Sequence, residues 1–382
     1  MLGRALSRAP ETRQSAARSV VALSAPGQPV WTPRDYGRLA REAYGANPVA
    51  HRCVRLVAEA AASLPFTVER GGAAAKPGDA AAALLAAPNP EQSGAELFET
   101  LYGHLLTAGN AYLEAAELDG APRELYALRP DRVKVLAGAR GWPDGFEYSA
   151  GGRSVRFARD PGSGRCAVLQ IKSFHPTNDH YGLSPLEAAA RAVDIHNAGA
   201  GWTKALLDNA ARPSGALVYS GGDGRMTDEQ FDRLKAELGE QHQGARNAGR
   251  PMLLDGGLDW KPLSLSPADM EFLEARREAA REIALAFGVP PMLLGIPGDN
   301  TYANYREANL AFWRQTVIPL ARKTAAAMTL WLQPWFGRDL TVCACEDRAP
   351  GLAAERAADW KRVSEADFLT REEKRAMLGI GA

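Results

Sequence analysis

The chain has 382 residues, 46% hydrophobic and 24% charged, the composition of a globular protein long enough to form more than one structural unit. Its 45 basic and 45 acidic residues cancel, which argues against a protein that grips nucleic acid tightly through phosphate contacts. The most apolar long stretch, residues 316–335, is interrupted by Pro319, Arg322 and Lys323, so no membrane-spanning helix is predicted.

The first thirty residues are basic. Their charged residues are Arg4, Arg8, Arg13 and Arg18, with Glu11 as the single acid. Organelle transit peptides share this composition, but a flexible basic arm ahead of the folded part is the simpler interpretation. Such an arm, residues 1–30, could touch nucleic acid or a neighbouring subunit.

Residues 31–183 are predicted to interleave helices and strands, with glycine-rich turns between them. The helices are expected at residues 48–63, 80–87 and 96–108, the last ended by Gly109. The strands are expected at residues 66–68, 111–114, 133–136, 146–148 and 167–171. This part of the chain should therefore be a mixed α and β unit.

Two long helices with the same start signal come next. Each begins with a serine, a proline in the first helical position and a carboxylate three residues after the serine, which is a capping box with proline in the first turn. The first helix should run to about Ala211 and the second should end at Phe287, before a glycine and two prolines. The capping residues are Ser184, Glu187, Ser266 and Asp269.

Residues 212–265 form an insertion between these two helices. Strands are predicted at residues 216–219 and around Met252 and Leu263, and a capped helix from Thr227 to Leu238. A polar, glycine-rich loop covers residues 244–250. The insertion should therefore be a separate subdomain carried on two helical supports.

A loop with almost every turn-forming residue follows at residues 294–301. The helical pattern from Tyr302 to about Trp331 contains Pro319, where the helix should kink or pause. Residues 340–345 alternate like one strand, and residues 352–380 are typical of two short helices joined near Ser364.

The sequence lacks the motifs of common enzymes. It contains no phosphate-binding loop, no His-Glu-x-x-His and no Gly-x-Ser-x-Gly. Its four cysteines form no Cys-x-x-Cys pair and are expected to be reduced thiols, so neither a metal nor a cofactor is expected. The remaining enzyme hypothesis is a hydrolase that uses His175, Asp179 and His180, although Pro176 prevents these residues from sharing a helix face.

Short motifs in a fixed order carry a resemblance to a known family. The segment Tyr181–Glu187, with the sequence YGLSPLE, closely resembles the portal protein family of HK97-type tailed phages. The other matching segments, in chain order, are residues 48–66, 88–90, 108–113, 211–215, 247–250, 263–267, 287–291 and 301–304. Each segment alone is a common turn or cap, but the series in family order spans about residues 48–335.

The resemblance implies an α+β portal fold. Its parts would be an α/β wing at residues 31–183, a first stem helix at 184–211, a clip at 212–265 and a second stem helix at 266–288. A tunnel loop at 289–304, a kinked tunnel helix at 305–335, a strand at 336–350 that returns to the wing and a short helical crown at 351–382 would follow.

The resemblance also implies a structural, non-enzymatic function. The family forms a closed ring of about twelve subunits at one capsid vertex, through which double-stranded DNA passes without sequence specificity. The expected partners are further copies of the chain, the terminase large subunit, the head-tail adaptor, and the major capsid and scaffolding proteins, with no membrane. The protein would be assembled in the bacterial cytoplasm and reside in the virion of a phage, a prophage or a gene transfer agent.

Two sets of site residues follow from the resemblance. The DNA-facing tunnel loop would present Pro297, Gly298, Asp299, Asn300, Thr301, Tyr302 and Asn304. The clip would dock its partners through Arg225, Gln243, Arg246, Asn247 and Arg250.

The charge is unevenly distributed along the chain. Residues 184–288 carry 12 basic and 16 acidic residues, whereas residues 305–338 carry 5 basic and 1 acidic. An acidic channel wall would repel phosphates, while the basic helix would contact DNA or neighbouring acidic subunits. Solvated faces of amphipathic helices explain the same pattern equally well. Besides the hydrolase, another DNA-associated ring or clamp remains an alternative.

Overall fold

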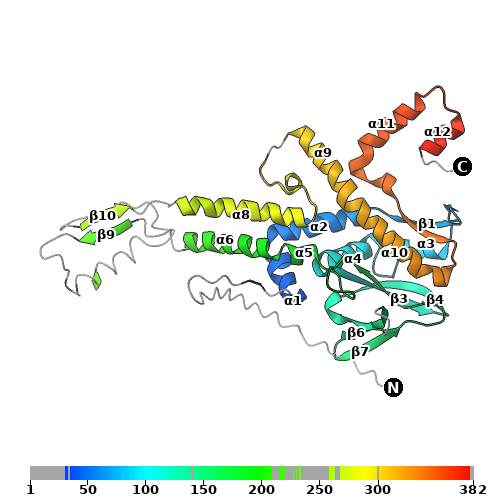
Figure 1. Ribbon diagram of the computed structural model, residues 1–382, viewed down its shortest axis with the longest axis horizontal. Coiled ribbons are helices and arrows are strands. Elements are labelled where there is room, and N and C mark those ends of the chain that lie inside the picture. The colour runs from blue at the N-terminus through cyan, green and yellow to red at the C-terminus, as the bar shows by residue number, and fades with distance from the viewer. Residues whose placement is uncertain are drawn as a thin grey trace, which may run out of the picture. The chain divides into compact units, whose positions relative to one another are not determined.

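The computed structural model describes residues 31–32, 35–138, 142–208, 215–219, 227, 229, 232–233, 258–262, 267–298 and 301–378 (Figure 1). Almost all of them belong to one unit, Thr32–Ala382. In these ranges helices are combined with small antiparallel sheets. The predicted α+β fold class is therefore confirmed.

Two helices near the start form as predicted and pack against each other. Helix α2 (Pro48–Ala62) begins at Asn47, whose side-chain oxygen accepts from the backbone N–H groups of Val49 and Ala50, both at 3.0 Å. Helix α4 (Gly94–Ala108) begins with a full capping box between Ser93 and Glu96. Both caps satisfy N–H groups that have no partner within the helix. A short helix α1 (Tyr36–Arg38) and a π-helical segment, Leu39–Gly45, precede α2.

Most strands lie in three small sheets. Strands β11 (Leu340–Ala344), β1 (Phe66–Arg70) and β2 (Ala73–Ala74) form the first, β4 (Ala121–Leu128), β3 (Asn110–Leu118) and β8 (Val168–Lys172) the second, and β5 (Val133–Ala137), β6 (Pro143–Ala150) and β7 (Arg153–Ala158) the third. All the pairings are antiparallel. The predicted strand near the C-terminus thus pairs with one formed about 270 residues earlier, Leu340 opposite Arg70.

The sequence analysis missed three strands: the two-residue β2 and the longer β4 and β7. Strand β4 contains Pro122 and lacks a long apolar run, yet it pairs with β3 across a register shift at Ala116 and Glu117. Strand β7 is almost entirely exposed and pairs only with β6. Both strands form because a neighbour supplies backbone partners, a tertiary effect that residue preferences do not report.

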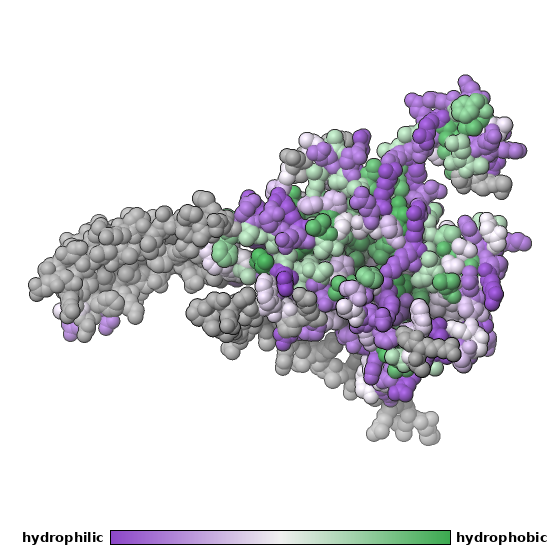
Figure 2. All heavy atoms as spheres, in the orientation of Figure 1, coloured by the Kyte–Doolittle hydropathy of each residue, from purple (hydrophilic) through white to green (hydrophobic). Residues whose placement is uncertain are grey.

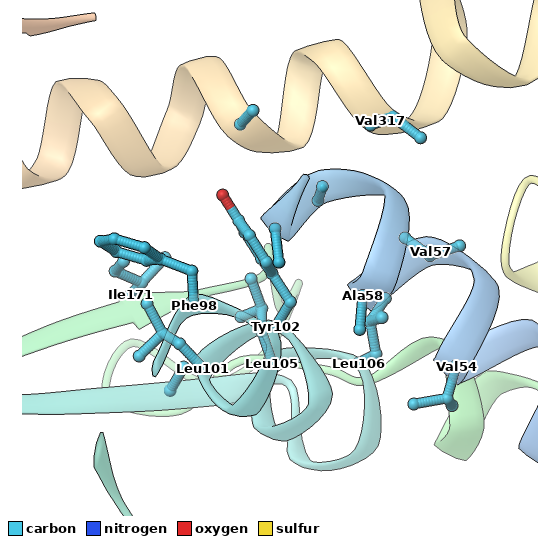
Figure 3. Close-up of a cluster of buried hydrophobic side chains, with 14 of the residues drawn as sticks. Val54, Val57, Ala58, Phe98, Leu101, Tyr102, Leu105, Leu106, Ile171 and Val317 are labelled. Carbon is cyan, nitrogen blue, oxygen red and sulfur yellow. The ribbon is translucent and has the colours of Figure 1, made fainter. Parts of the chain in front are cut away.

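The core lies where α2, α4 and α10 (Ile318–Phe336) meet. Figure 3 shows Phe98, Leu101, Tyr102 and Leu105 on α4, with the Tyr102 side chain directed toward the helix that carries Val317. Tyr102 is fully buried, and its desolvation raises the pKa of its hydroxyl. Helix α3 (Ala80–Ala86) adds smaller buried side chains at the edge of this core.

The first predicted long helix is divided in two. Helix α5 (Pro185–Ala188) ends at Ala189, and α6 (Ala190–Asp208) follows at once. Helix α8 (Pro267–Ala286) lies beside α6, and Trp202 of α6 stacks on Phe272 of α8 with ring centroids 5.0 Å apart (Figure 1). The end expected for the first helix near Ala211 lies outside the described residues.

Part of the insertion between these helices is described. Strand β9 (Gly215–Tyr219) forms where it was predicted and pairs antiparallel with β10 (Leu258–Pro262). The strand expected around Leu263 therefore lies slightly earlier in the chain. The strand expected around Met252, and most of the helix expected from Thr227 to Leu238, lie outside the described residues.

The long helix near Pro319 is interrupted as predicted. Helix α9 (Tyr302–Phe312) continues into a π-helical segment, Trp313–Val317, and then into α10. Proline lacks the N–H that would bond to Gln315 and crowds its carbonyl, so a wider turn before it relieves both problems. No helix in the described ranges is long and apolar enough to cross a membrane.

The two short helices predicted at the end are present as α11 (Ala353–Ser364) and α12 (Arg371–Met377). A full capping box between Thr370 and Glu373 starts α12. Two short 3₁₀ turns, residues 346–348 and 350–352, connect α11 to β11.

The backbone of Gly109 lies against the backbone of Gly182. A Cβ atom on Gly182 would lie 2.2 Å from the Gly109 carbonyl oxygen, and one on Gly109 would lie 2.4 Å from that of Gly182. The Asn110 side-chain oxygen accepts from the Gly182 N–H at 2.9 Å. This contact joins the end of α4 and the start of β3 to the segment that leads into α5.

We predict that Gly182→Ala destabilises the protein by about 1–3 kcal/mol, because the added methyl overlaps backbone atoms that cannot rotate away. Gly103→Ala is the matched control, since a Cβ atom there meets nothing within 4 Å and alanine favours the helix. Thermal unfolding of both variants checks the prediction. Equal transition midpoints would show that the contact between the two glycines is not tight.

Candidate functional site

The turn-rich segment predicted to be functional connects α8 to α9. Gly288 ends α8 with a φ of +64°, a conformation that glycine adopts without strain. A short 3₁₀ turn, Pro291–Leu294, follows, and Gly295, with a φ of +72°, ends it. Both chain reversals therefore depend on a glycine.

Hydrogen bonds hold the loop close to both of its ends. The Thr316 hydroxyl, in the π-helical segment, donates to the Gly288 carbonyl at 2.7 Å. The Arg281 guanidinium, on α8, donates to the Pro297 carbonyl at 3.2 Å. Thr301 caps α9, and its side-chain oxygen accepts from the Asn304 N–H at 3.2 Å. The described part of the loop is thus attached to α8, to the π-helical segment and to α9.

The predicted tunnel-loop residues are exposed wherever their side chains are described. Pro297, Gly298, Thr301 and Asn304 are all on the surface. The backbone of Tyr302 begins α9, but its side chain lies outside the described atoms, as do Asp299 and Asn300 entirely. The structure thus brings the described residues together at one exposed turn and the start of one helix.

The basic excess of residues 305–338 is largely paired within the chain. Arg314 pairs with Glu355 of α11 at 2.8 Å, and two guanidinium nitrogens of Arg322, Nε and Nη2, contact the Glu346 carboxylate, Nη2 at 2.7 Å. Arg306 lies 3.4 Å from Glu307. These basic residues therefore have acidic partners within the chain. Exposed ion pairs of this kind contribute little to stability.

Lys323 is the other basic residue of this helix with a partner. Its ammonium donates to the backbone carbonyl of Lys172, on β8. Partial desolvation lowers the pKa of Lys323, because the charged form loses hydration. The interaction fixes α10 to the second sheet.

The helix α8 carries charges that pair along its own surface. Glu274 lies 3.4 Å from Arg277, and Glu278 contacts Arg281. The four side chains are exposed, so these pairs are screened by solvent. Arg281 differs from the other three because its guanidinium also donates to the Pro297 carbonyl in the loop.

The cap residues differ in how much of them is described. The Ser184 oxygen accepts from the Glu187 N–H at 2.9 Å, so Ser184 caps α5. Helix α8 begins at Pro267, but Ser266 and the side chain of Asp269 lie outside the described residues. The proposed clip residues Arg225, Gln243, Arg246, Asn247 and Arg250 also lie outside them.

The residues of the hydrolase hypothesis do not form a joint site in residues 142–208, which are all described. His175 Nδ1 accepts from the Thr177 N–H at 3.1 Å, Asp179 is exposed, and no hydrogen bond or ion pair joins the three side chains. Across the described ranges, no group of three His, Cys, Asp or Glu residues could hold a metal ion.

Sequence reasoning missed Arg281 and Thr316 as anchors of the loop. The sequence analysis gave Arg281 no role and included Thr316 only as the first residue of an apolar stretch. For Thr316 the available signal was indirect. Pro319 makes the helix irregular in the turn before it, and side chains in an irregular turn often bond to other parts of a protein.

The chain is similar to proteins of phage portals and gene transfer agents. Residues 48–379 match the family described as phage portal protein. A chain in the neck of a native gene transfer agent (GTA) particle, computed with C12 symmetry, is 53% identical, with a TM-score of 0.74 over 94% of this chain and 97% of that one.

Two further relatives extend the comparison. A chain in the virion of a native GTA particle is 52% identical, with a TM-score of 0.75, and the match covers 94% of this chain and 97% of that one. The portal protein of Enterobacteria phage HK97 is 25% identical over 338 residues, 85% of this chain and 76% of that protein.

We predict that Thr316→Val loosens the loop at residues 288–298, because it removes the bond to Gly288 and keeps the shape of the side chain. The cost should be about 0.5–1.5 kcal/mol, typical of one hydrogen bond. Amide hydrogen exchange should quicken in that loop. Thr100→Val is the control, since it loses only a bond within α4, to the Glu96 carbonyl at 3.0 Å. Unchanged exchange at 288–298 would show that Thr316 does not hold the loop.

Proposed function

Because this chain belongs to the phage portal protein family, we propose that twelve copies of it close into the ring-shaped channel at one vertex of a capsid. The observation that carries the proposal is the 53% identity, over almost the whole chain, to a protein in a particle neck computed with C12 symmetry. The protein is a structural portal subunit, and double-stranded DNA would pass through its ring during packaging and ejection.

The parts of the fold suggest how the ring would be divided. The three sheets with α2, α4 and α10 would form the wing, and α5, α6 and α8 would form the stem. The segment with β9 and β10 would be the clip, which would dock the terminase large subunit and later the head-tail adaptor. Helices α11 and α12 would be the crown, and α9 with α10 the tunnel helix.

The loop from Gly288 to Thr301 is the best candidate for contact with DNA. Pro297, Gly298 and Thr301 are exposed, Thr316 and Arg281 hold the loop at Gly288 and Pro297, and residues 288–301 contain no basic residue. A loop without positive charge touches the phosphate backbone only weakly and without regard to sequence. Weak contact suits a conduit, because strong contact would hold the duplex back.

The particle would be of the gene transfer agent type. Three solved structures that share about half of their residues with this chain are from GTA particles, whereas the HK97 phage portal protein shares a quarter. The protein would then be assembled in the bacterial cytoplasm and would reside in the virion, with capsid and scaffolding proteins around it.

We expect the purified protein to have a native mass near 0.5 MDa, because twelve copies of a 41.0 kDa chain close the ring. Mass photometry measures the mass, and negative-stain images should show a central hole. The ring should hydrolyse no ATP, because the sequence has no phosphate-binding loop. A monomer or dimer that persists with capsid and scaffolding proteins present would refute the ring, and robust ATPase activity would refute the structural role.

We expect the double change Asp299→Lys with Asn300→Lys to slow DNA packaging, because two added cations in each subunit would bind passing phosphates. Ring assembly should be unchanged, while DNA binding by the purified ring should strengthen and depend more steeply on salt. Asp299→Asn with Asn300→Gln is the uncharged control. If the lysine variant packages and binds DNA like the control, this loop does not face the DNA.

A further inference from the structure

The C-terminal helical hairpin, α11 and α12 with the turn between them, buries very little. Residues 353–378 are all described, and Val363 is the one buried side chain among them. Three large apolar side chains are exposed: Trp360 at 52%, Phe368 at 87% and Met377 at 61%. Figure 2 shows apolar side chains on this hairpin at the upper right. One exposed apolar residue is ordinary, but three on 26 residues indicate a surface that another protein covers.

The base of the hairpin is bonded to the described residues that precede it in the chain. The Arg356 guanidinium donates to the carbonyls of Glu346, at 3.3 Å, and Ala349, at 2.9 Å. Glu355 pairs with Arg314 at the same end. Helix α12 is attached to α11 through Lys374, whose ammonium donates to the Ser364 carbonyl at 2.9 Å. The exposed aromatic residues lie beyond these attachments.

A groove of about 520 Å³ lies elsewhere on the chain, between α10 and β11. We call it the α10–β11 groove. Its lining is mainly apolar and includes Ala325, Leu330, Val342 and Cys343, and Leu330 is 72% exposed. The ion pair between Arg322 and Glu346 is also part of its lining. This surface is large enough to receive an aromatic side chain and has none from its own hairpin, since Phe368 remains exposed.

The groove is suited to side chains rather than to an added strand. Strand β11 is an edge strand, and α10 occupies its free edge. The Val342 N–H donates to the Thr329 hydroxyl at 2.9 Å, and the Gln333 amide donates to the Leu340 carbonyl at 3.1 Å. These bonds satisfy the groups that a partner strand would need. An occupant must therefore bind through apolar side chains.

A second copy of this chain fits both surfaces. A closed ring joins each copy to the next through two unlike, complementary patches, and here one patch projects while the other is a groove. Nucleic acid is a poor occupant of the hairpin, because residues 353–378 carry six acidic and six basic residues. The choice of a second copy rests on the proposed ring and assigns one contact between neighbouring subunits in it.

We propose that the hairpin of one copy, with Phe368 at its tip, docks in the α10–β11 groove of the neighbouring copy. The contact would bury the exposed apolar residues of both surfaces. It would also add a contact near the tip of the hairpin to the bonds at its base.

Chemical cross-linking tests the contact with a native residue, because Cys343 lies in the groove. Phe368→Cys places a second thiol at the tip of the hairpin, and a short bismaleimide is applied to the purified ring. Denaturing gels should show a ladder from dimer upward. The ladder should disappear when Cys343→Ser is added. Phe174→Cys is the matched control, since Phe174 is 82% exposed on another loop, and it should give no ladder.

The outcomes separate this contact from the ring itself. A ring of the expected mass without a ladder would overturn the docking, and so would a ladder that survives Cys343→Ser. Failure of the unmodified protein to form a ring would refute the proposed function instead. If Phe368→Cys alone prevents assembly, Asp367→Cys, at the exposed polar neighbour, is cross-linked in the same way. A missing ladder, or one that survives Cys343→Ser, would again overturn the docking.

Discussion

The contact between Gly109 and Gly182 is the constraint on which the arrangement of the chain depends. It is a backbone-to-backbone approach that any side chain would prevent. Asn110 completes it: its side-chain oxygen accepts from the Gly182 N–H and from the Gln170 amide, at 2.9 and 3.1 Å. One residue therefore fixes the end of α4, the strand β8 and the entry to α5 together.

The two motifs that meet there are also two of those that carried the resemblance. These motifs are residues 108–113 and 181–187, and each alone is an ordinary turn or cap. Asn110 in the first and Gly182 in the second are 72 positions apart in the sequence. The structure explains why such weak motifs occur together, because the backbone contact requires a glycine at both positions. Short motifs in a fixed order can thus record a tertiary contact that neither motif predicts by itself.

Much of the helical structure could be predicted from the sequence, because its signals are local. Proline after a capping residue starts α2 and α5, Gly109 ends α4, and Pro319 produces the π-helical segment. Strands β4 and β7 could not be predicted, since their formation depends on partners rather than on their own residues. The loop residues were identified by resemblance, whereas the anchors Arg281 and Thr316 required the fold.

Most basic residues of 305–338 have partners within the chain that the residue count alone did not indicate. Residues 305–338 do carry a basic excess, but Arg314 and Arg322 are paired with Glu355 and Glu346 of the C-terminal segment. The same pairs position the base of the hairpin beside α10. Arg314 and Arg322 therefore help to hold the C-terminal segment, whereas the turn between α8 and α9, which we propose faces the DNA, contains no basic residue. If this turn lines the channel as proposed, the phosphates of a passing duplex would meet no cation there, and weak contact of that kind would let the duplex move.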